Sequence, residues 1–235
     1  MLLLRRKDRD RHRDQIRWFT TLKGIVGMLR DPEHTDSVFD IEDGLRGLRA
    51  YRHALEFVRS SPAVRQQIEV RYLAPPPDLG QLLALPAPSL GHAFARHIVD
   101  HGFDPDYFRK LDVRDDLDWM LMRIRQTHDI WHVVTGLDTS RGGELALKAF
   151  ELAQTRRPMA LVIAAGGALR YLLRDPAELG AVLRGISLGY RLGLACAPFL
   201  AQRWEEGWHR PLADWRAELR VDAAGADPDR VLVGA

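Results

Sequence analysis

The chain has 235 residues, of which 46% are hydrophobic and 28% are charged, and its formal net charge is +2. These proportions are typical of a folded globular protein and exclude a disordered chain, and the near-neutral balance gives no general attraction for nucleic acid. The single cysteine, Cys196, excludes an intramolecular disulfide and lies in an apolar run that favours a buried, inert thiol.

The two ends of the chain differ in character from its middle. Residues 1–16 form a basic arm, whose opening apolar run is too short for a signal peptide and whose acidic residues argue against a transit peptide. Residues 222–235 are small and polar, and we predict a flexible tail there. We expect one domain over residues 17–221, in which no stretch reaches the roughly 18 apolar residues of a membrane-spanning helix.

The middle of the chain shows helical spacing throughout and lacks the alternating β-branched runs of strands. This pattern predicts an all-α single domain of about eight to ten helices. Asp40 is expected to cap a helix that continues to Ser61, and a shorter helix follows over residues 63–73. The segment APPPDLG, residues 74–80, is the clearest linker in the sequence.

The next helices carry clear start and stop signals. Ser89 is a predicted N-cap and Gly102 the glycine that ends the same helix. Asp104–Pro105 is expected to open another helix with proline at its first position. A long helix is predicted from Asp115 to Val134.

The glycine-bearing break LDTSRGG, residues 137–143, separates that long helix from the helical segment ELALKAFELAQ. Pro158 and Pro176 each open a further predicted helix, the second reaching Glu206. The segment PLADWRAEL, residues 211–219, supplies a terminal helix.

Three side chains that can bind a metal lie close together near the end of the long helix. His128, Asp129 and His132 share an arc of about 120° with Arg125 and Gly136, because each helical residue turns the chain by about 100°. Imidazoles four residues apart can hold one divalent ion. Metal binding has two alternatives. Such histidine pairs also occur as surface groups, and Arg125 with Asp129 could form a simple ion pair.

Glu144 opens the following helix after the short reversal, so its carboxylate is expected to return alongside the histidines. Asp129 either reaches the same ion or orients a histidine from behind. A set of two imidazoles and one or two carboxylates suits zinc, iron(II) or manganese. Gly136 removes a side chain one turn beyond the ligands and leaves room for a substrate or for the next helix.

The segment HDIWH at residues 128–132, followed after eleven residues by Glu144, resembles the motif of the Coq-four family of coenzyme Q biosynthesis proteins. The segments 85–106, 123–129 and 143–154 match the same family, and the resemblance covers residues 20–220. One departure is Ser89, where the family usually has threonine.

The resemblance implies an all-α protein with a divalent metal, zinc before iron or manganese, held by His128, Asp129, His132 and Glu144. It also implies that the chain binds polyprenylated quinone precursors and contacts other ubiquinone biosynthesis proteins. The same resemblance implies a peripheral contact with a membrane surface and is compatible with a homodimer. The expected location is cytoplasmic, at the inner membrane, and no nucleic-acid partner is expected.

Two roles follow from the resemblance: oxidative decarboxylation at ring carbon C1, or a non-catalytic scaffold that organises the biosynthetic enzymes. A metal-dependent hydrolase is a third interpretation of the same residues. In the first role Arg125 is the expected catalytic partner of the substrate carboxylate. Gly136, Gly167 and Gly189 are the predicted lipid-binding positions, because small residues between helices either allow close packing or leave a groove for an isoprenoid tail.

Overall fold

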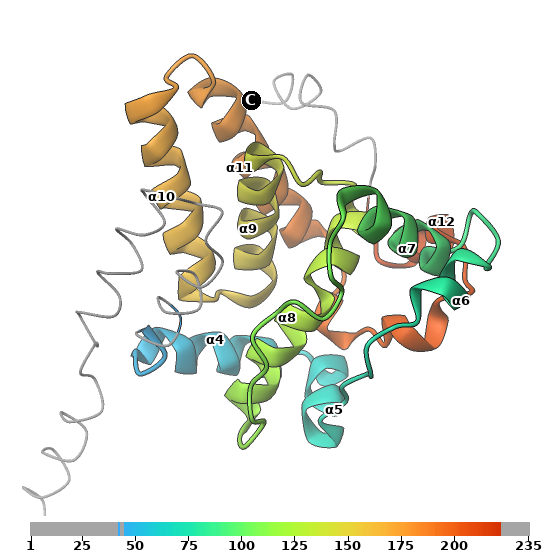
Figure 1. Ribbon diagram of the computed structural model, residues 1–235. Helices are drawn as coiled ribbons and strands as arrows, with labels where there is room; N and C mark the ends of the chain where they lie inside the picture. Colours follow the sequence, from blue (N-terminus) through green and yellow to red (C-terminus); the bar gives the residue numbers. More distant parts are fainter. Residues whose placement is uncertain (1–41, 43–44, 222–235) are drawn as a thin grey trace, which may run out of the picture.

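The computed structural model describes residue 42 and residues 45–221 of the chain. Within these residues every regular element is helical, apart from one isolated bridge between Ser89 and Pro211, and the all-α prediction is confirmed (Figure 1). None of the described helices is both long enough and apolar enough to cross a bilayer. The basic arm, residues 1–16, and the C-terminal tail, residues 222–235, lie outside the described residues and stay predictions.

The elements, in chain order, are α4 (Arg49–Arg59), α5 (Pro62–Val70), α6 (Leu79–Leu83), α7 (Leu90–His101), α8 (Asp116–Thr135), α9 (Arg141–Thr155), α10 (Pro158–Arg174), α11 (Leu179–Ala195), the 3-10 helices η1 (Phe199–Ala201) and η2 (Trp204–Gly207), and α12 (Leu212–Glu218). Helix α9 packs against both α10 and α11, and α8 crosses beside this group toward α4 and α5 (Figure 1).

The first half of the chain departs from the prediction at two places. A turn at residues 46–48 precedes α4, so no continuous helix runs to Ser61, and the predicted cap Asp40 lies outside the described residues. The proline-rich linker ends in the unpredicted helix α6, because the side chain of Asp78 accepts a hydrogen bond of 3.1 Å from the backbone N–H of Gln81.

The helix predicted from Asp104–Pro105 is wrong. The Asp104 carboxylate accepts a hydrogen bond from the backbone N–H of Asp106 at 2.9 Å, and the Tyr107 N–H bonds to the Asp104 carbonyl at 3.1 Å. These two bonds close a turn on itself, and a short aspartate bonded in this way competes with helix formation. The chain then remains irregular until α8.

The helix predicted to run from Pro176 to Glu206 ends early, at Ala195. Pro198 cannot donate a backbone hydrogen bond, and it disfavours the helical conformation of the residue before it. Two short 3-10 helices follow in place of a continuous helix.

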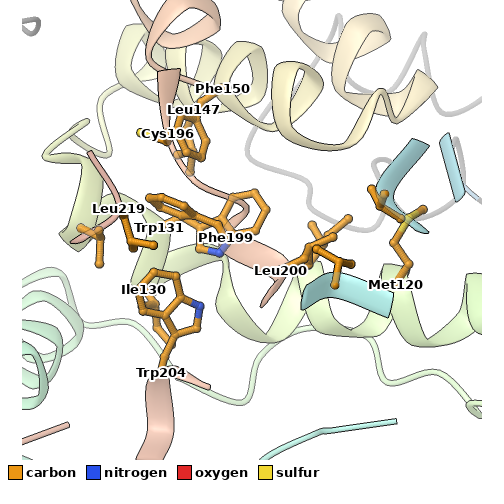
Figure 2. Close-up of a cluster of buried hydrophobic side chains, with 14 of the residues drawn as sticks. Met120, Ile130, Trp131, Leu147, Phe150, Cys196, Phe199, Leu200, Trp204 and Leu219 are labelled. Carbon is orange, nitrogen blue, oxygen red and sulfur yellow. The ribbon is translucent and has the colours of Figure 1, made fainter. Parts of the chain in front are cut away.

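A connected set of aromatic side chains forms the centre of the core (Figure 2). Trp131 of α8 meets Phe150 of α9 at a ring distance of 5.8 Å, and both contact Phe199, at 5.7 and 4.8 Å. Phe199 continues the series to Trp204 at 5.2 Å. All four side chains are at most 1% exposed. This contact set therefore fixes α8 and α9 against the C-terminal segment.

Glycines allow the helices around α9 to approach it closely. A Cβ atom on Gly189 of α11 would lie 1.9 Å from the carbonyl oxygen of Ala146, and one on Gly193 would lie 2.6 Å from that of Phe150. A Cβ on Gly167 of α10 would meet the side chain of Leu145 at 2.3 Å. Of the two roles open to these small residues, the structure shows close packing: α9 fills the space that the groove prediction left for a lipid.

A buried cluster of charges joins the start of the described chain to α8 and α9. The carboxylate of Glu42 contacts the guanidinium groups of Arg125 and Arg157, the latter at 2.6 Å. Glu151 contacts Arg157 at 2.5 Å and Lys148 at 3.0 Å. Burial raises the pKa of Glu151, but the charges of Arg157 and Lys148 outweigh burial and hold that pKa at about 2.

We predict that Gly189→Ala lowers the free energy of unfolding by about 1–3 kcal/mol, because the added methyl group cannot share space with the backbone of α9. The matched control is Gly185→Ala on the same helix, where a Cβ would lie 3.8 Å from that of Ala146, an ordinary contact. That control should be neutral or slightly stabilising, since alanine favours a helix more than glycine does. Denaturant unfolding of both variants measures the difference, and equal stabilities would contradict the packing argument.

We predict that Glu151→Gln destabilises the chain by about 3–5 kcal/mol at neutral pH, because it leaves Arg157 buried without one of its partners. The folded-state pKa of Glu151 is depressed, so its contribution is present above the ordinary value of 4.5 and is lost as the pH falls through about 2. The unfolding free energies of wild type and variant should therefore converge as the solution is acidified. Glu56→Gln, which changes an exposed carboxylate, is the control and should shift stability by less than about 0.5 kcal/mol.

Candidate metal centre

The two histidines lie on α8, whose first and last residues are set by capping interactions. Asp115 accepts a hydrogen bond from the N–H of Asp118 at 2.8 Å, and the Asp118 carboxylate returns one from the N–H of Asp115 at 3.3 Å. This reciprocal capping starts a helix of 20 residues. His128 and His132 lie one turn apart near its C-terminus, with ring centroids 4.9 Å apart.

The chain reverses tightly between α8 and α9. Gly136 ends α8 in the left-handed region, with φ of +75°, which glycine adopts without steric cost. Asp138 accepts hydrogen bonds from the N–H and the hydroxyl of Ser140, and Ser140 in turn caps α9 by accepting from the N–H of Gly143 at 3.1 Å. A Cβ on Gly143 would lie 2.0 Å from the Asp138 carboxylate. The reversal therefore depends on glycine at both ends.

This reversal brings Glu144 back to the histidines, as the sequence predicts. Its Oε1 lies 3.0 Å from His132 Nε2, and its Oε2 lies 3.6 Å from His128 Nε2. Among the described residues, His128, His132 and Glu144 are the group of three whose ligand atoms all lie within 4.8 Å of one another. Asp129 is not part of this group.

Each histidine is oriented through its other ring nitrogen. His132 Nδ1 donates a hydrogen bond to the carbonyl oxygen of Leu137 at 2.8 Å, which turns Nε2 toward Glu144. His128 Nδ1 lies 3.1 Å from the carboxylate of Asp129, which turns its Nε2 the same way. Oxygen acceptors behind histidines are the usual outer-shell arrangement in metal sites.

The Glu144 carboxylate favours the charged form of the His132 imidazole. Burial lowers the pKa of His132, but the Glu144 carboxylate beside it outweighs burial and raises that pKa above its ordinary value. Burial raises the pKa of Glu144, yet contact with the two histidines brings it down to about 2. Burial likewise raises the pKa of Asp129, and His128 more than reverses the effect. The carboxylates are therefore ionised at neutral pH, the form that a cation requires.

The other predicted site residues lie in different surroundings. Arg125 shares the helix face of the histidines, but its guanidinium contacts Glu42 and donates to the Arg109 carbonyl at 2.7 Å. Arg125 is only 8% exposed and its observed contacts are structural, while its predicted catalytic role stays a prediction. Gly136 is the cap of α8, while Gly167 and Gly189 are packing contacts of α9.

A histidine that the site prediction missed approaches from α7. The ring of His97 lies 6.0 Å from that of His132, with an interplanar angle of 22°. Burial lowers the pKa of His97, and the charge of Asp129 opposes that effect. The sequence carried a signal, because His97 and His101 have the same four-residue spacing as His128 and His132.

The chain is thus an all-helical domain in which two histidines and a glutamate face one another across a short reversal. A family model described as coenzyme Q (ubiquinone) biosynthesis protein Coq4 matches residues 16–224. The chain belongs to this family, and the resemblance seen in the sequence is confirmed.

Individual relatives agree with the family match. The Mycosarcoma maydis protein "Ubiquinone biosynthesis protein COQ4, mitochondrial" is 26% identical over 86% of this chain and 63% of its own length. The Danio rerio homologue is 33% identical over 62% of this chain and 54% of its own length. A crystal structure from Nostoc punctiforme, described as that of a candidate ubiquinone biosynthesis protein, shows 32% identity and a TM-score of 0.79, covering 88% of this chain and 99% of that one.

The relatives differ from this chain in length, and their names state a location. The chain spans 63%, 45% and 52% of the lengths of three curated relatives that it matches. The curated relatives are named mitochondrial, which contradicts the predicted cytoplasmic location at the inner membrane, and that prediction is corrected here.

Proposed function

We propose that the chain acts in ubiquinone biosynthesis by removing the C1 carboxyl group of a polyprenylated hydroxybenzoate-type ring, with a divalent metal as cofactor. The observation that carries this proposal is the convergence of ligand atoms from His128, His132 and Glu144 within 4.8 Å of one another. Such a convergence of two imidazoles and a carboxylate across two helices is costly to hold without a cation or a proton between them.

In this proposal His128, His132 and Glu144 hold the ion, and Asp129 orients His128 from behind. The hydrogen bond from His132 Nδ1 to the Leu137 carbonyl leaves Nε2 to face the ion. Three protein ligands leave open positions, and this donor set suits zinc first, with iron(II) and manganese as alternatives. A bound divalent ion supplies Lewis-acid polarisation of a carboxylate oxygen.

The proposed reaction replaces a carboxyl group by a hydroxyl group. The bond between the ring and the carboxyl carbon breaks and CO₂ leaves, while water supplies the new oxygen atom. Two electrons and two protons pass to an external two-electron acceptor, for which a quinone is the chemical class that we propose. The chain itself contributes the binding and orientation of the ring.

We propose that the polyprenyl tail binds to an exposed face of α10 and α11 rather than at the glycines. Large apolar side chains of α10 and α11 are 42% to 68% exposed, and a group of exposed apolar side chains is typical of an interaction surface. They are Leu161, Leu169, Leu172, Leu173, Leu183, Tyr190 and Leu194. The turn between α10 and α11 lies at the same end of the molecule as the start of α9, which carries Glu144 (Figure 1). A tail on this face would place its ring toward the candidate metal centre.

The same residues are also compatible with two other functions. In a non-catalytic scaffold the ion would only fasten α8 to α9, with lipid binding as the output. In a metal-dependent hydrolase Asp129 would act as the base, but its carboxylate contacts His128 Nδ1 and thereby serves to orient that ring. The contact favours an orienting role for Asp129 over a base.

We predict that the purified chain carries about one divalent ion and that His128→Ala loses it. His128 is the better variant than His132, because its side chain is 26% exposed against 1%, so truncation should cost little stability. His53→Ala, which removes an exposed histidine already paired with Glu56, is the matched control and should keep the ion. Elemental analysis with circular dichroism measures both effects, and equal ion content in all three proteins would remove the metal from the proposal.

We predict that Glu144→Gln gives a folded chain that no longer supports ubiquinone synthesis and accumulates a precursor bearing its C1 carboxyl group. The amide keeps the size of the side chain but removes its charge, and a loss of roughly 3–4 kcal/mol from the transition state lowers a rate by about 10²–10³. The measurement is lipid extraction and mass spectrometry in cells that lack their own C1 step.

Glu69→Gln, at an exposed glutamate of α5, is the control and should leave ubiquinone at the wild-type level. Protein levels must be matched between the strains. Normal ubiquinone in cells with Glu144→Gln would rule out the catalytic function and leave the scaffold as the better account.

A further inference from the structure

A cavity of about 440 Å³ lies at the start of α8, at the opposite end of this helix from the candidate metal centre. Its wall includes side chains of α4, the residue that ends α5 and the segment that leads into α8. Figure 1 shows α8 beginning at the lower end of the molecule, whereas α9 begins at the upper end. At about 1.5 Å per helical residue, Asp116 in the cavity wall lies roughly 18 Å from His128 along the helix axis. The cavity is therefore a separate place from the candidate metal centre.

Arg71 is fixed in the wall of this cavity. It ends α5 in the left-handed region, with φ of +47° and ψ of +46°. This conformation is uncommon for a residue other than glycine, and it persists where the surroundings hold it. Its guanidinium donates hydrogen bonds to the carbonyl oxygens of Val113 and Arg114, at 3.4 and 3.2 Å. These bonds fasten the end of α5 to the segment before α8 and keep a cation at the cavity.

Two aspartates also lie in the wall, and both already have partners. The Asp115 carboxylate caps α8 by accepting a hydrogen bond from the N–H of Asp118 at 2.8 Å. The Asp116 carboxylate lies 3.1 Å from the guanidinium of Arg59. The two negative charges are thus engaged in the structure of α8 and in an ion pair, rather than with the arginines of the wall.

The other two arginines of the wall are accessible. Arg52 is exposed, and within the described part of the chain it has no hydrogen bond or ion pair. The side chain of Arg114 is 77% exposed, and its Nε lies 3.7 Å from the Asp118 carboxylate, which is longer than a hydrogen bond. A guanidinium donates through a planar fork that fits two oxygens of one phosphate. Three such groups around one cavity therefore favour an anion with several oxygens.

We propose that this cavity binds a small organic phosphate, whose phosphate group is held by Arg52, Arg71 and Arg114. Leu55 and Leu117 also line the cavity and supply apolar surface for the organic part. This site does not depend on the metal or on the reaction proposed above. The phosphate belongs either to a soluble ester or to the head group of a phospholipid, and the test separates these two sources.

The test is calorimetric titration of the full chain with monobutyl phosphate. Arg52→Gln and Arg114→Gln should each weaken binding about tenfold, because each removes a charged donor pair while circular dichroism stays unchanged. Arg52→Lys keeps the charge without the planar fork, and its affinity should lie between those of Arg52→Gln and the wild type. Arg96→Gln removes an exposed arginine from α7 and is the control, with unchanged affinity expected.

His128→Ala should bind monobutyl phosphate as the wild type does. A loss in that variant, with binding retained in the two glutamine variants of the cavity, would place the phosphate at the candidate metal centre and overturn the proposal. A lack of saturable binding by the wild type at millimolar probe would also overturn it. Cosedimentation with phosphatidylcholine vesicles that contain phosphatidic acid, lost in Arg52→Gln and Arg114→Gln, would identify a phospholipid head group. Binding of monobutyl phosphate without cosedimentation would identify a soluble ester.

Discussion

The contact between Glu144 and His132 joins the last turn of α8 to the first turn of α9. It is made across a reversal of only a few residues, so its two partners are brought together by local chain geometry rather than by long-range packing. Helix α9 then packs against both α10 and α11, which also contact each other. The same contact belongs to the candidate centre and lies at the start of the helix that packs against α10 and α11.

Charge is buried at two levels along α9, and the two have different physical consequences. At Glu151 a carboxylate contacts the Lys148 ammonium and the Arg157 guanidinium, so its charge is compensated and its role is structural. At Glu144 the carboxylate faces two imidazoles, which are neutral or charged according to conditions and can exchange a proton for a metal ion. Only the second arrangement has the adaptable partners that ion binding needs.

Local signals in the sequence predicted much of the fold and the centre of the site. Ser89 and Asp115 cap the N-termini of α7 and α8 with their side chains, and Gly102 ends α7 in a left-handed conformation. The spacing of His128, His132 and Glu144 was enough to predict their convergence, because all three depend on one helix and one short turn. What failed was also local: a turn closed by Asp104 competed with a helix, and Pro198 ended one.

Tertiary contacts account for what the sequence could not predict. Arg125 lies on the histidine face by helical geometry, yet its long side chain reaches Glu42, which is 83 residues away in the chain. His97 enters the centre from α7, and no spacing rule relates α7 to α8. Sequence spacing therefore predicts short side chains near a turn better than long side chains or neighbours from other helices.

The glycines of α10 and α11 show why small residues alone do not indicate a lipid site. A glycine that faces another helix lets two backbones meet, whereas one that faces solvent leaves a hollow, and the sequence pattern is the same in both cases. Here Gly189 and Gly193 pack against backbone carbonyl oxygens of α9, so the space beside them is filled by that helix. By holding α11 close to α9, they turn the larger side chains Leu183 and Leu194 away from the core, where these side chains are 48% and 63% exposed. The apolar outer face is thus a consequence of the close inner one.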